Sequence, residues 1–200
     1  MDFDKATKHF QKMDPVLYSL IKKVGPVEAI KPRSQSVYFQ SICREIIGQQ
    51  LNGKVARVIF DRFTKLFPNQ KIIPEYLLKI SDAKIRKTGA SWSKVSFVKD
   101  LAKKVVKGEL KLAKLKHLND EQVITELTKV KGIGPWTAQM FLMFTLGRED
   151  VFSKGDLGLR KAITKLYGNR EIESIIRKWS PYKTYASLVL WKSQDKEEWT

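Results

Sequence analysis

The chain has 200 residues, enough to bury a sizeable hydrophobic core in one domain or in two small ones. Its 38 lysines and arginines exceed its 21 aspartates and glutamates, and the net charge of +17 favours a polyanionic partner, although ribosomal and membrane-surface proteins share this property. The single cysteine excludes an intramolecular disulfide and a four-cysteine iron–sulfur cluster, and the two histidines add no His/Cys cluster for zinc.

Apolar residues recur at helical spacing along most of the chain, with no sustained strand pattern and no repeat. This periodicity predicts an all-α protein. The predicted helices cover 14–24, 37–50, 54–67, 74–80, 81–88, 93–107, 120–130, 137–146, 156–167, 169–179 and 182–193. The tail 195–200 is polar and is expected to fray.

Two of these helices carry specific expectations. The buried face of helix 54–67 is predicted to be the apolar stripe Val55, Val58, Ile59, Phe63 and Leu66. Helix 93–107 carries a run of basic residues that fits a solvated face: Lys94, Lys99, Lys103 and Lys104. In helix 37–50, Cys43 is expected to be a small core residue and not a reactive thiol.

The segment Gln49-Gln50-Leu51-Asn52 joins helices 37–50 and 54–67, and Asn52-Gly53 breaks the helical run. One explanation is a plain turn in which Leu51 is buried. The other is a loop that contacts a binding partner.

A glycine-punctuated turn, Lys131-Gly132-Ile133-Gly134-Pro135-Trp136, separates helix 120–130 from an almost wholly apolar helix. The glycines allow a tight reversal, and Pro135 suits the first turn of the next helix. The N–H groups at that helix start point outward with the positive end of the helix dipole behind them, which favours a phosphate. A plain turn between two helices is the alternative.

About twenty residues further on, Asp156 precedes a helix in the segment Phe152-Ser153-Lys154-Gly155-Asp156. Aspartate is a common N-cap, and capping also fixes where its carboxylate points. The two roles, cap and functional carboxylate, are therefore compatible.

Four segments in this order resemble the motifs of the AlkA-type, 3-methyladenine DNA glycosylase II branch of the helix-hairpin-helix (HhH-GPD) glycosylases, over about residues 14–192. The segments are Ile46 to Asn52, Gly132 to Ala138, Asp150 to Asp156, and Trp179 to Ala186 together with Trp191. The β-sheet domain that precedes this core in the bacterial AlkA-type enzyme has no counterpart in the chain.

The resemblance implies an all-α, two-lobed fold with the active-site cleft between the lobes. Lobe A would span about 36–150 and contain the hairpin 120–146. Lobe B would combine about 1–35 with 151–194. The implied activity is base excision repair of double-stranded DNA, in which an alkylated purine is flipped out and removed hydrolytically. We expect a monomer, located with the nucleoid of a prokaryote or in a eukaryotic nucleus, since no signal-peptide pattern is present.

The implied catalytic residue is Asp156. Cleavage of the bond between C1′ and the base nitrogen builds positive charge on the sugar, which a carboxylate stabilises while it orients or deprotonates water. One carboxylate suffices when the leaving base is already cationic, as an N-alkylated purine is.

The implied base pocket is aromatic, since a flat electron-rich wall attracts an electron-poor purine. Its expected residues are Trp136, Trp191, Tyr182, Tyr185 and Met140, the last at a position where the family often has tyrosine. Packing in the core is the alternative role for these side chains. In the loop, Gln50 or Leu51 would fill the space of the flipped base, beside Gln49, and Asn52 would contact the opposite strand.

Phosphate contacts are expected from Lys131 and from the hairpin residues Gly132, Ile133, Gly134 and Trp136, chiefly through the amides of Gly132, Gly134 and Trp136. The resemblance also allows a monovalent cation, Na⁺ or K⁺, at the carbonyls of Thr128, Val130 and Ile133; no other cofactor is expected. Relatives that cut the DNA strand have a lysine nucleophile where this chain has Trp136, which predicts a monofunctional enzyme. The alternatives are a non-catalytic DNA-binding module and a glycosylase for another damaged base, such as hypoxanthine, ethenoadenine or an oxidised base.

Overall fold

The computed structural model describes residues 3–195, with side chains to Gln194, and within that range the chain is helical without strands. The all-α expectation is confirmed. The expected fraying concerns residues outside this range, except that Asp195 is the last residue of α12. The chain forms two compact units: unit 1 contains residues 1–32 and 146–200, and unit 2 contains residues 33–145.

The units divide at 32/33 and 145/146, a few residues before the lobe boundaries expected near 35 and 150. Hydrogen bonds explain the observed positions. Arg33 closes unit 2 where the chain enters and leaves it, because its N–H donates to Thr145 O (2.9 Å) and its Nε to Phe144 O (3.1 Å). The segment after residue 146 is bonded instead to α12. The N–H of Thr184 donates to Glu149 O (2.8 Å), and the hydroxyl of Thr184 accepts from the N–H of Val151 (3.1 Å).

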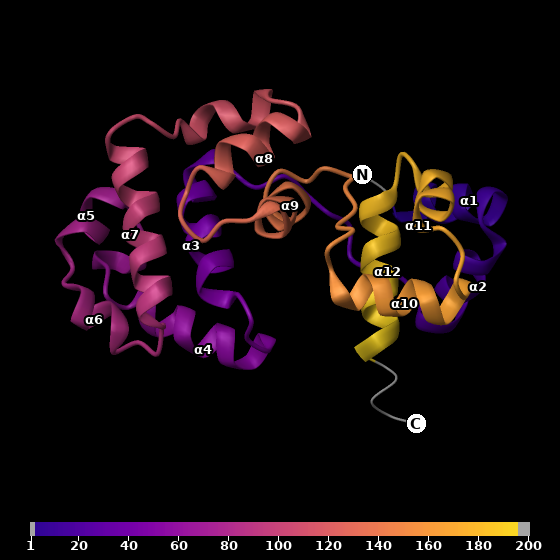
Figure 1. Ribbon diagram of the computed structural model, residues 1–200, viewed down its shortest axis with the longest axis horizontal. Coiled ribbons are helices and arrows are strands. Elements are labelled where there is room, and N and C mark those ends of the chain that lie inside the picture. The colour runs from indigo at the N-terminus through magenta and orange to yellow at the C-terminus, as the bar shows by residue number, and fades with distance from the viewer. Residues whose placement is uncertain (1–2, 196–200) are drawn as a thin grey trace. The chain divides into compact units, whose positions relative to one another are not determined.

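Unit 1 consists of helices from both ends of the chain (Figure 1). They are α1 (Phe3–Met13), α2 (Pro15–Val24), α10 (Leu157–Tyr167), α11 (Ile172–Ile176) with a 3₁₀ turn at Arg177–Trp179, and α12 (Lys183–Asp195). α12 packs against α2 and α10, and α1 packs against α2. The sequence expectation omitted α1, although Phe3, Ala6 and Phe10 lie on one helical face and are buried.

Asp14 organises the interior of unit 1. Its Oδ1 caps α2 by accepting from the N–H of Leu17 (3.1 Å), and its Oδ2 accepts from Tyr167 Oη and Trp179 Nε1 (2.8 Å each). Asp14 is only 4% exposed, so these bonds replace the water that a carboxylate requires. Burial and the hydrogen bond to Asp14 raise the pKa of Tyr167.

Unit 2 contains the remaining helices. They are α3 (Tyr38–Gly48), α4 (Gly53–Thr64), α5 (Pro74–Lys79), α6 (Asp82–Arg86), α7 (Trp92–Val106), α8 (Asp120–Thr128) and α9 (Pro135–Phe144), with 3₁₀ turns at Gln35–Val37, Pro68–Gln70 and Leu112–His117. α7 packs against α3, α5 and α6, and α9 packs against α3 and α8.

The core of unit 2 corrects one expectation and confirms another. In α4, Ile59 and Phe63 are buried as expected, but Val55 and Val58 are 42% and 48% exposed, so the predicted stripe is wrong at its N-terminal end. Cys43 is fully buried, and burial raises the pKa of its thiol, as expected of a core residue.

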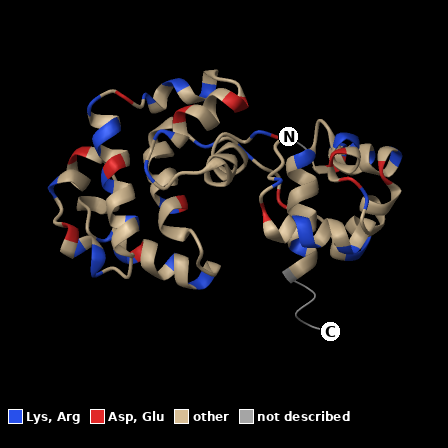
Figure 2. Cartoon of the chain, viewed as in Figure 1, with Lys and Arg blue, Asp and Glu red and all other residues tan. Residues whose placement is uncertain are grey.

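Charge is spread over the molecule. Figure 2 shows lysines and arginines on helices of both units, while α9 carries no charged residue. None of the helices in the described range is long and apolar enough to cross a membrane.

Candidate DNA-binding turn and catalytic carboxylate

The turn between α8 and α9 is built by its glycines. Gly132 has a φ of +77°, a region that favours glycine, and the Phe97 ring occupies the place where a Cβ would be. Ile133 is buried and anchors the turn. Pro135 is the first residue of α9, in the first turn as the sequence predicted. Gly134 is the N-cap with a φ of −97°, so of the two glycines only Gly132 has a conformation that favours glycine.

This turn presents donors to solvent. Among residues 3–195, no protein acceptor is found for the N–H groups of Gly132 and Gly134. Lys131 is exposed beside them, but its own N–H donates to Asp100 Oδ2 (2.9 Å). The geometry suits an anion at the start of α9, with the Lys131 ammonium nearby.

The loop between α3 and α4 lies against this turn. Gln49 Nε2 donates to Gly132 O and to Thr137 Oγ1, both at 2.9 Å. Gln50 is exposed and has a φ of +56°, a conformation that non-glycine residues seldom adopt. Leu51 is half-buried, so a fully buried turn does not describe this loop.

Asn52 ends the loop as the N-cap of α4, accepting from the N–H of Val55 at 2.9 Å. That bond explains the break in helical structure that the sequence indicated at this point. The role of Asn52 on a DNA strand stays a prediction.

The expected solvated face of α7 is wrong for two of its lysines. Lys94 Nζ donates to the carbonyls of Ile47 and Gln49 at 2.8 Å each. Lys99 Nζ donates to Leu78 O (3.2 Å) and pairs with Asp82. Both ammonium groups bind helix-end carbonyls, because the long lysine stem reaches across to a neighbouring helix. A run of basic residues in a sequence does not indicate which lysines make such tertiary contacts.

Of the two expected pocket residues on α9, Trp136 is 38% exposed in the first turn, where its ring is accessible to a ligand. Met140, one turn further, is 4% exposed. This burial fits the alternative role, packing in the core, because α9 is apolar on nearly all faces and packs into unit 2; the pocket role of Met140 stays a prediction.

Asp156 is the N-cap of α10, as the sequence predicted. Its Oδ1 accepts from the N–H of Leu159 (2.8 Å) and from Trp191 Nε1 (3.2 Å), so backbone and indole together set the direction of the carboxylate. A Cβ at Gly158 would lie 3.1 Å from the same oxygen, and glycine therefore leaves room for it. Leu157 is 71% exposed beside the carboxylate.

The tyrosines of the expected pocket lie in unit 1 and differ from each other. Tyr185 is fully buried and contacts the rings of Phe3 and Tyr182 at centroid distances of 5.9 and 6.4 Å. These contacts favour the alternative role of Tyr185, packing in the aromatic core, and its place on a pocket wall stays an untested prediction. Tyr182 is half-buried, and His9 meets it edge-on at 5.4 Å. Trp191, which reaches Asp156, is the better placed aromatic.

Sequence reasoning identified the carboxylate and the turn but missed Phe97 and Asp100, which hold the turn, and the bond of Lys94 to the adjoining loop. It also missed Asp14, which organises the core of unit 1. Of the expected cation ligands, Val130 O accepts from the N–H of Ile133 at 3.1 Å and keeps a second lone pair, so the cation site at Thr128, Val130 and Ile133 stays a prediction. No group of three His, Cys, Asp or Glu side chains suited to a metal occurs in the described range.

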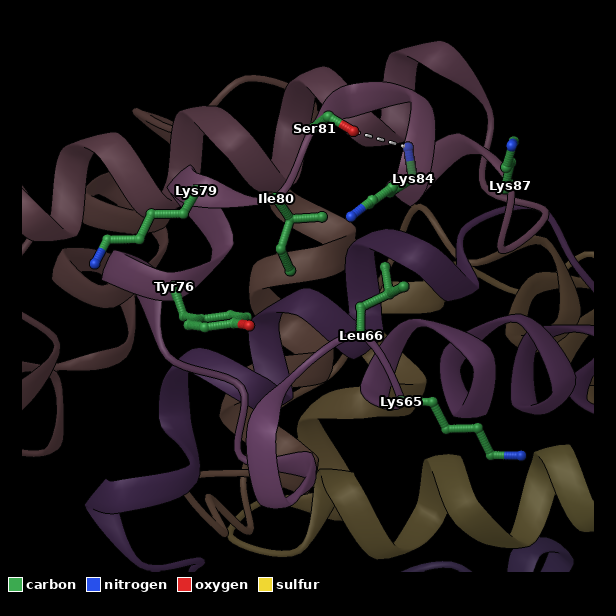
Figure 3. A pocket seen from close by; sticks show the side chains of 8 residues that line it. All are labelled: Lys65, Leu66, Tyr76, Lys79, Ile80, Ser81, Lys84 and Lys87. Carbon is green, nitrogen blue, oxygen red and sulfur yellow. Dashed lines mark hydrogen bonds between the residues drawn. The ribbon is translucent and has the colours of Figure 1, made fainter.

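A separate pocket of about 750 Å³ lies in unit 2 between the end of α4 and α5–α6 (Figure 3). Tyr76, Ile80 and Leu66 line it, with four lysines around its rim: Lys65, Lys79, Lys84 and Lys87. The lysine ammonium groups spread in different directions and do not converge on one point (Figure 3). This pocket therefore lacks the convergent donors of a site for a single phosphate.

An all-α fold with a glycine-containing turn at a helix start is the arrangement found in helix-hairpin-helix proteins, in which the helix start suits a phosphate. The sequence profile of the HhH-GPD superfamily of base excision DNA repair proteins matches residues 43–181, and the chain belongs to this family.

Relatives agree with this assignment. The chain is 35% identical to YfjP of Bacillus subtilis over 160 residues, which cover 74% of this chain and 56% of YfjP; it thus spans about half the length of that relative. The structure of the Bacillus halodurans DNA-3-methyladenine glycosidase matches with a TM-score of 0.79 at 35% identity, covering 96% of this chain and 90% of that one. The Schizosaccharomyces pombe 3-methyladenine DNA glycosylase Mag1, solved with abasic DNA, matches with a TM-score of 0.88 at 28% identity, covering 98% and 99%.

Proposed function

We propose that this protein is a DNA glycosylase of base excision repair that removes alkylated purines of the 3-methyladenine and 7-methylguanine type and leaves an abasic site. The observation that carries the proposal is the fixed carboxylate of Asp156, held at a helix start by Leu159 N–H and Trp191 Nε1. Relatives that are 3-methyladenine DNA glycosylases support this substrate class.

Double-stranded DNA is the proposed partner of a monomeric enzyme. Backbone amides of Gly132, Gly134 and Trp136 bind a phosphate, with Lys131 adding charge. In the loop between α3 and α4, exposed Gln50 is the proposed wedge, because it stands at the tip while Leu51 is half-buried. Na⁺ or K⁺ at carbonyls of the hairpin would assist phosphate binding without taking part in the chemistry.

In unit 1, the proposed aromatic contact of the flipped base is Trp191, whose indole bonds to Asp156. The role of the exposed Trp136 on the base stays a prediction. As the bond between C1′ and the base nitrogen breaks, its electron pair leaves with the cationic base, which becomes neutral. Positive charge builds on the sugar beside the Asp156 carboxylate. Asp156 then takes a proton from the water whose oxygen bonds to C1′.

The chain is also proposed to lack strand-cutting activity. Lyase chemistry requires an amine that forms a Schiff base with C1′, and Trp136 stands at the position of the lysine in relatives that have it. Borohydride reduction should therefore trap no covalent complex with abasic DNA. A trapped complex would refute the monofunctional assignment and would direct attention to Lys131 and Lys154.

The function is tested by single-turnover release of 3-methyladenine and 7-methylguanine from alkylated duplex DNA. Wild type should release both bases, and Asp156→Asn should be slower by roughly 10²- to 10³-fold. Asparagine caps a helix as well as aspartate does, so the fold and DNA affinity should persist. Glu28→Gln, at an exposed carboxylate of the same unit, should match wild type.

Two outcomes would change the assignment. Near wild-type release by Asp156→Asn would remove Asp156 from the chemistry. Tight DNA binding without release of either base would first favour hypoxanthine or ethenoadenine as substrate, and without release of those, a non-catalytic DNA-binding module.

A further inference from the structure

One face of α7 contacts both segments that are proposed to bind DNA. Lys94, Phe97 and Asp100 follow each other at a spacing of three residues, which places them along one side of the helix. Lys94 bonds to the loop between α3 and α4, and the other two contact the hairpin turn. None of the three belongs to either segment.

Lys94 of α7 binds carbonyls at the C-terminal end of α3 and in the loop that follows it. Its Nζ donates to Ile47 O and Gln49 O, 2.8 Å each, two carbonyls at the negative end of the helix dipole. The ammonium is half-buried, and burial lowers its pKa. These bonds set the point from which the chain turns to Gln50, the exposed residue with positive φ.

Asp100 and Phe97 hold the hairpin turn from behind. Asp100 Oδ2 accepts from the N–H of Lys131, and the Phe97 ring fills the space left by the missing side chain of Gly132. One N–H of the turn is thus used internally, which orients the peptide units that follow it.

Hydrogen bonds from the Gln49 side chain complete the contacts among α7, the loop and the turn. Gln49, whose own carbonyl is bound by Lys94, donates through its side chain to Gly132 O and Thr137 Oγ1. α7, the loop and the turn are therefore linked pairwise: helix to loop, loop to turn, and turn to helix. No two of these parts can shift relative to each other without breaking at least one hydrogen bond.

We infer that Lys94 and Asp100 are positioning residues that hold the base-displacing loop and the phosphate-binding turn in one register. The inference rests on the proposed function, since it assigns these two residues to the same reaction. When the turn binds the DNA backbone, the loop then enters the duplex to a fixed depth. Displacement of about 1 Å can cost roughly 100-fold in rate, so the bonds matter although neither residue touches DNA.

The first arm of the test uses DNA. Lys94→Met should slow single-turnover release of 3-methyladenine by roughly 10- to 100-fold, with affinity for undamaged duplex reduced far less, because flipping depends on loop depth and backbone binding does not. Lys94→Arg, which keeps charge and donors, should recover most of the loss. Lys103→Met removes the same charge from an exposed position of α7 and serves as the matched control.

Asp100 offers a second matched pair. Asp100→Asn keeps an oxygen that can accept from Lys131 N–H, while Asp100→Leu removes it. Release should be slow in Asp100→Leu and close to wild type in Asp100→Asn. Equal loss in both variants would show that charge, and not the hydrogen bond to the turn, is what Asp100 contributes, and would overturn its positioning role.

The second arm needs no DNA and no activity. Amide hydrogen exchange should quicken at Gln49–Leu51 and at Lys131–Ile133 in Lys94→Met, but not in Lys103→Met. Faster exchange in both segments would support the coupling even if wild type released no base, a result that would count against the proposed function alone. Unchanged exchange in both segments, or a uniform loss of protection throughout unit 2, would overturn the inference.

Discussion

The hairpin turn of unit 2 and the start of α10 at Asp156 in unit 1, here called the Asp156 corner, are built in opposite ways. At the turn, the side chains of Asp100 and Gln49 hold backbone groups of Lys131 and Gly132 in place. At the corner, a backbone N–H and an indole hold one side chain in place. The difference follows from the ligand: phosphate binding uses peptide N–H groups, whereas charge on a sugar requires a carboxylate.

This comparison predicts which substitutions each site tolerates. The turn should be sensitive to changes in backbone conformation and less so to the chemistry of its own side chains. The corner should respond to the loss of single functional groups while the fold remains.

The largest effect is expected for Gly132→Ala. Its positive φ and the overlap of a Cβ with the Phe97 ring together should cost about 2–5 kcal/mol of unfolding free energy. Gly134→Ala is the matched change, since no atom lies within 4 Å of its Cβ position. Urea denaturation should separate the two, and equal stability of both variants would contradict the role of Phe97 in the turn.

A comparable loss of stability is expected in unit 1 for Asp14→Ala. Tyr167 Oη and Trp179 Nε1 would lose their acceptor inside the core, at a cost of about 2–4 kcal/mol. Hydrogen exchange should show the loss in unit 1 only. The exposed residue Asp61 in unit 2 gives the control variant Asp61→Ala, which should unfold like wild type. If amide protection against exchange fell equally in both units, the effect of Asp14→Ala would not be confined to unit 1, contrary to this prediction.

A smaller effect, on activity and not on stability, is expected for Trp191→Phe. The substitution keeps an aromatic ring but removes the donor to Asp156 Oδ1, a hydrogen bond to a charged group worth about 1.5 kcal/mol, or roughly tenfold in base release. Thermal unfolding should change little. Trp92→Phe, at an exposed tryptophan on α7, is the control. Unchanged release in Trp191→Phe would mean that Leu159 N–H alone orients the carboxylate.

The smallest effect concerns pH. Burial raises the pKa of Glu45 above its ordinary 4.5, an effect that Arg44 and Arg33 oppose. The folded state therefore holds this proton more tightly than the unfolded state, and stability declines as pH rises from below 4.5 through the folded pKa. Glu45→Gln removes that decline. The variant should exceed wild type in unfolding free energy at neutral pH, with the gap closing in acid; a gap that widens in acid would contradict the direction of the shift.

Local patterns sufficed for much of the fold and for parts of the site. Helix periodicity predicted the all-α class, and Gly134-Pro135 and Asp156 were identified as helix starts because caps depend on residues within one turn. The family motifs pointed to the hairpin. The roles of these residues on DNA stay predictions until base release is measured.

Other features could not be read from local patterns. Tyr185 and Met140 are buried, which favours the core role over the pocket role. The sequence left both roles open, because a motif fixes residue type and spacing but not which face a helix presents. The run of basic residues on α7 gave no indication that Lys94 bonds to the end of α3. The sequence is the same whether the ammonium group of a lysine contacts water or a carbonyl.

The sequence by itself determined the helical class, the glycine-built turn, the helix start at Asp156 and the family, each of which depends on residues close together in the chain. The tertiary structure decided which side chains hold these parts. Asp14 meets Trp179, Lys94 meets Gln49, and Trp191 meets Asp156 only after distant helices have packed. The physical reason is that turns and caps are set by local backbone geometry, whereas these partners are brought together by burial of the cores.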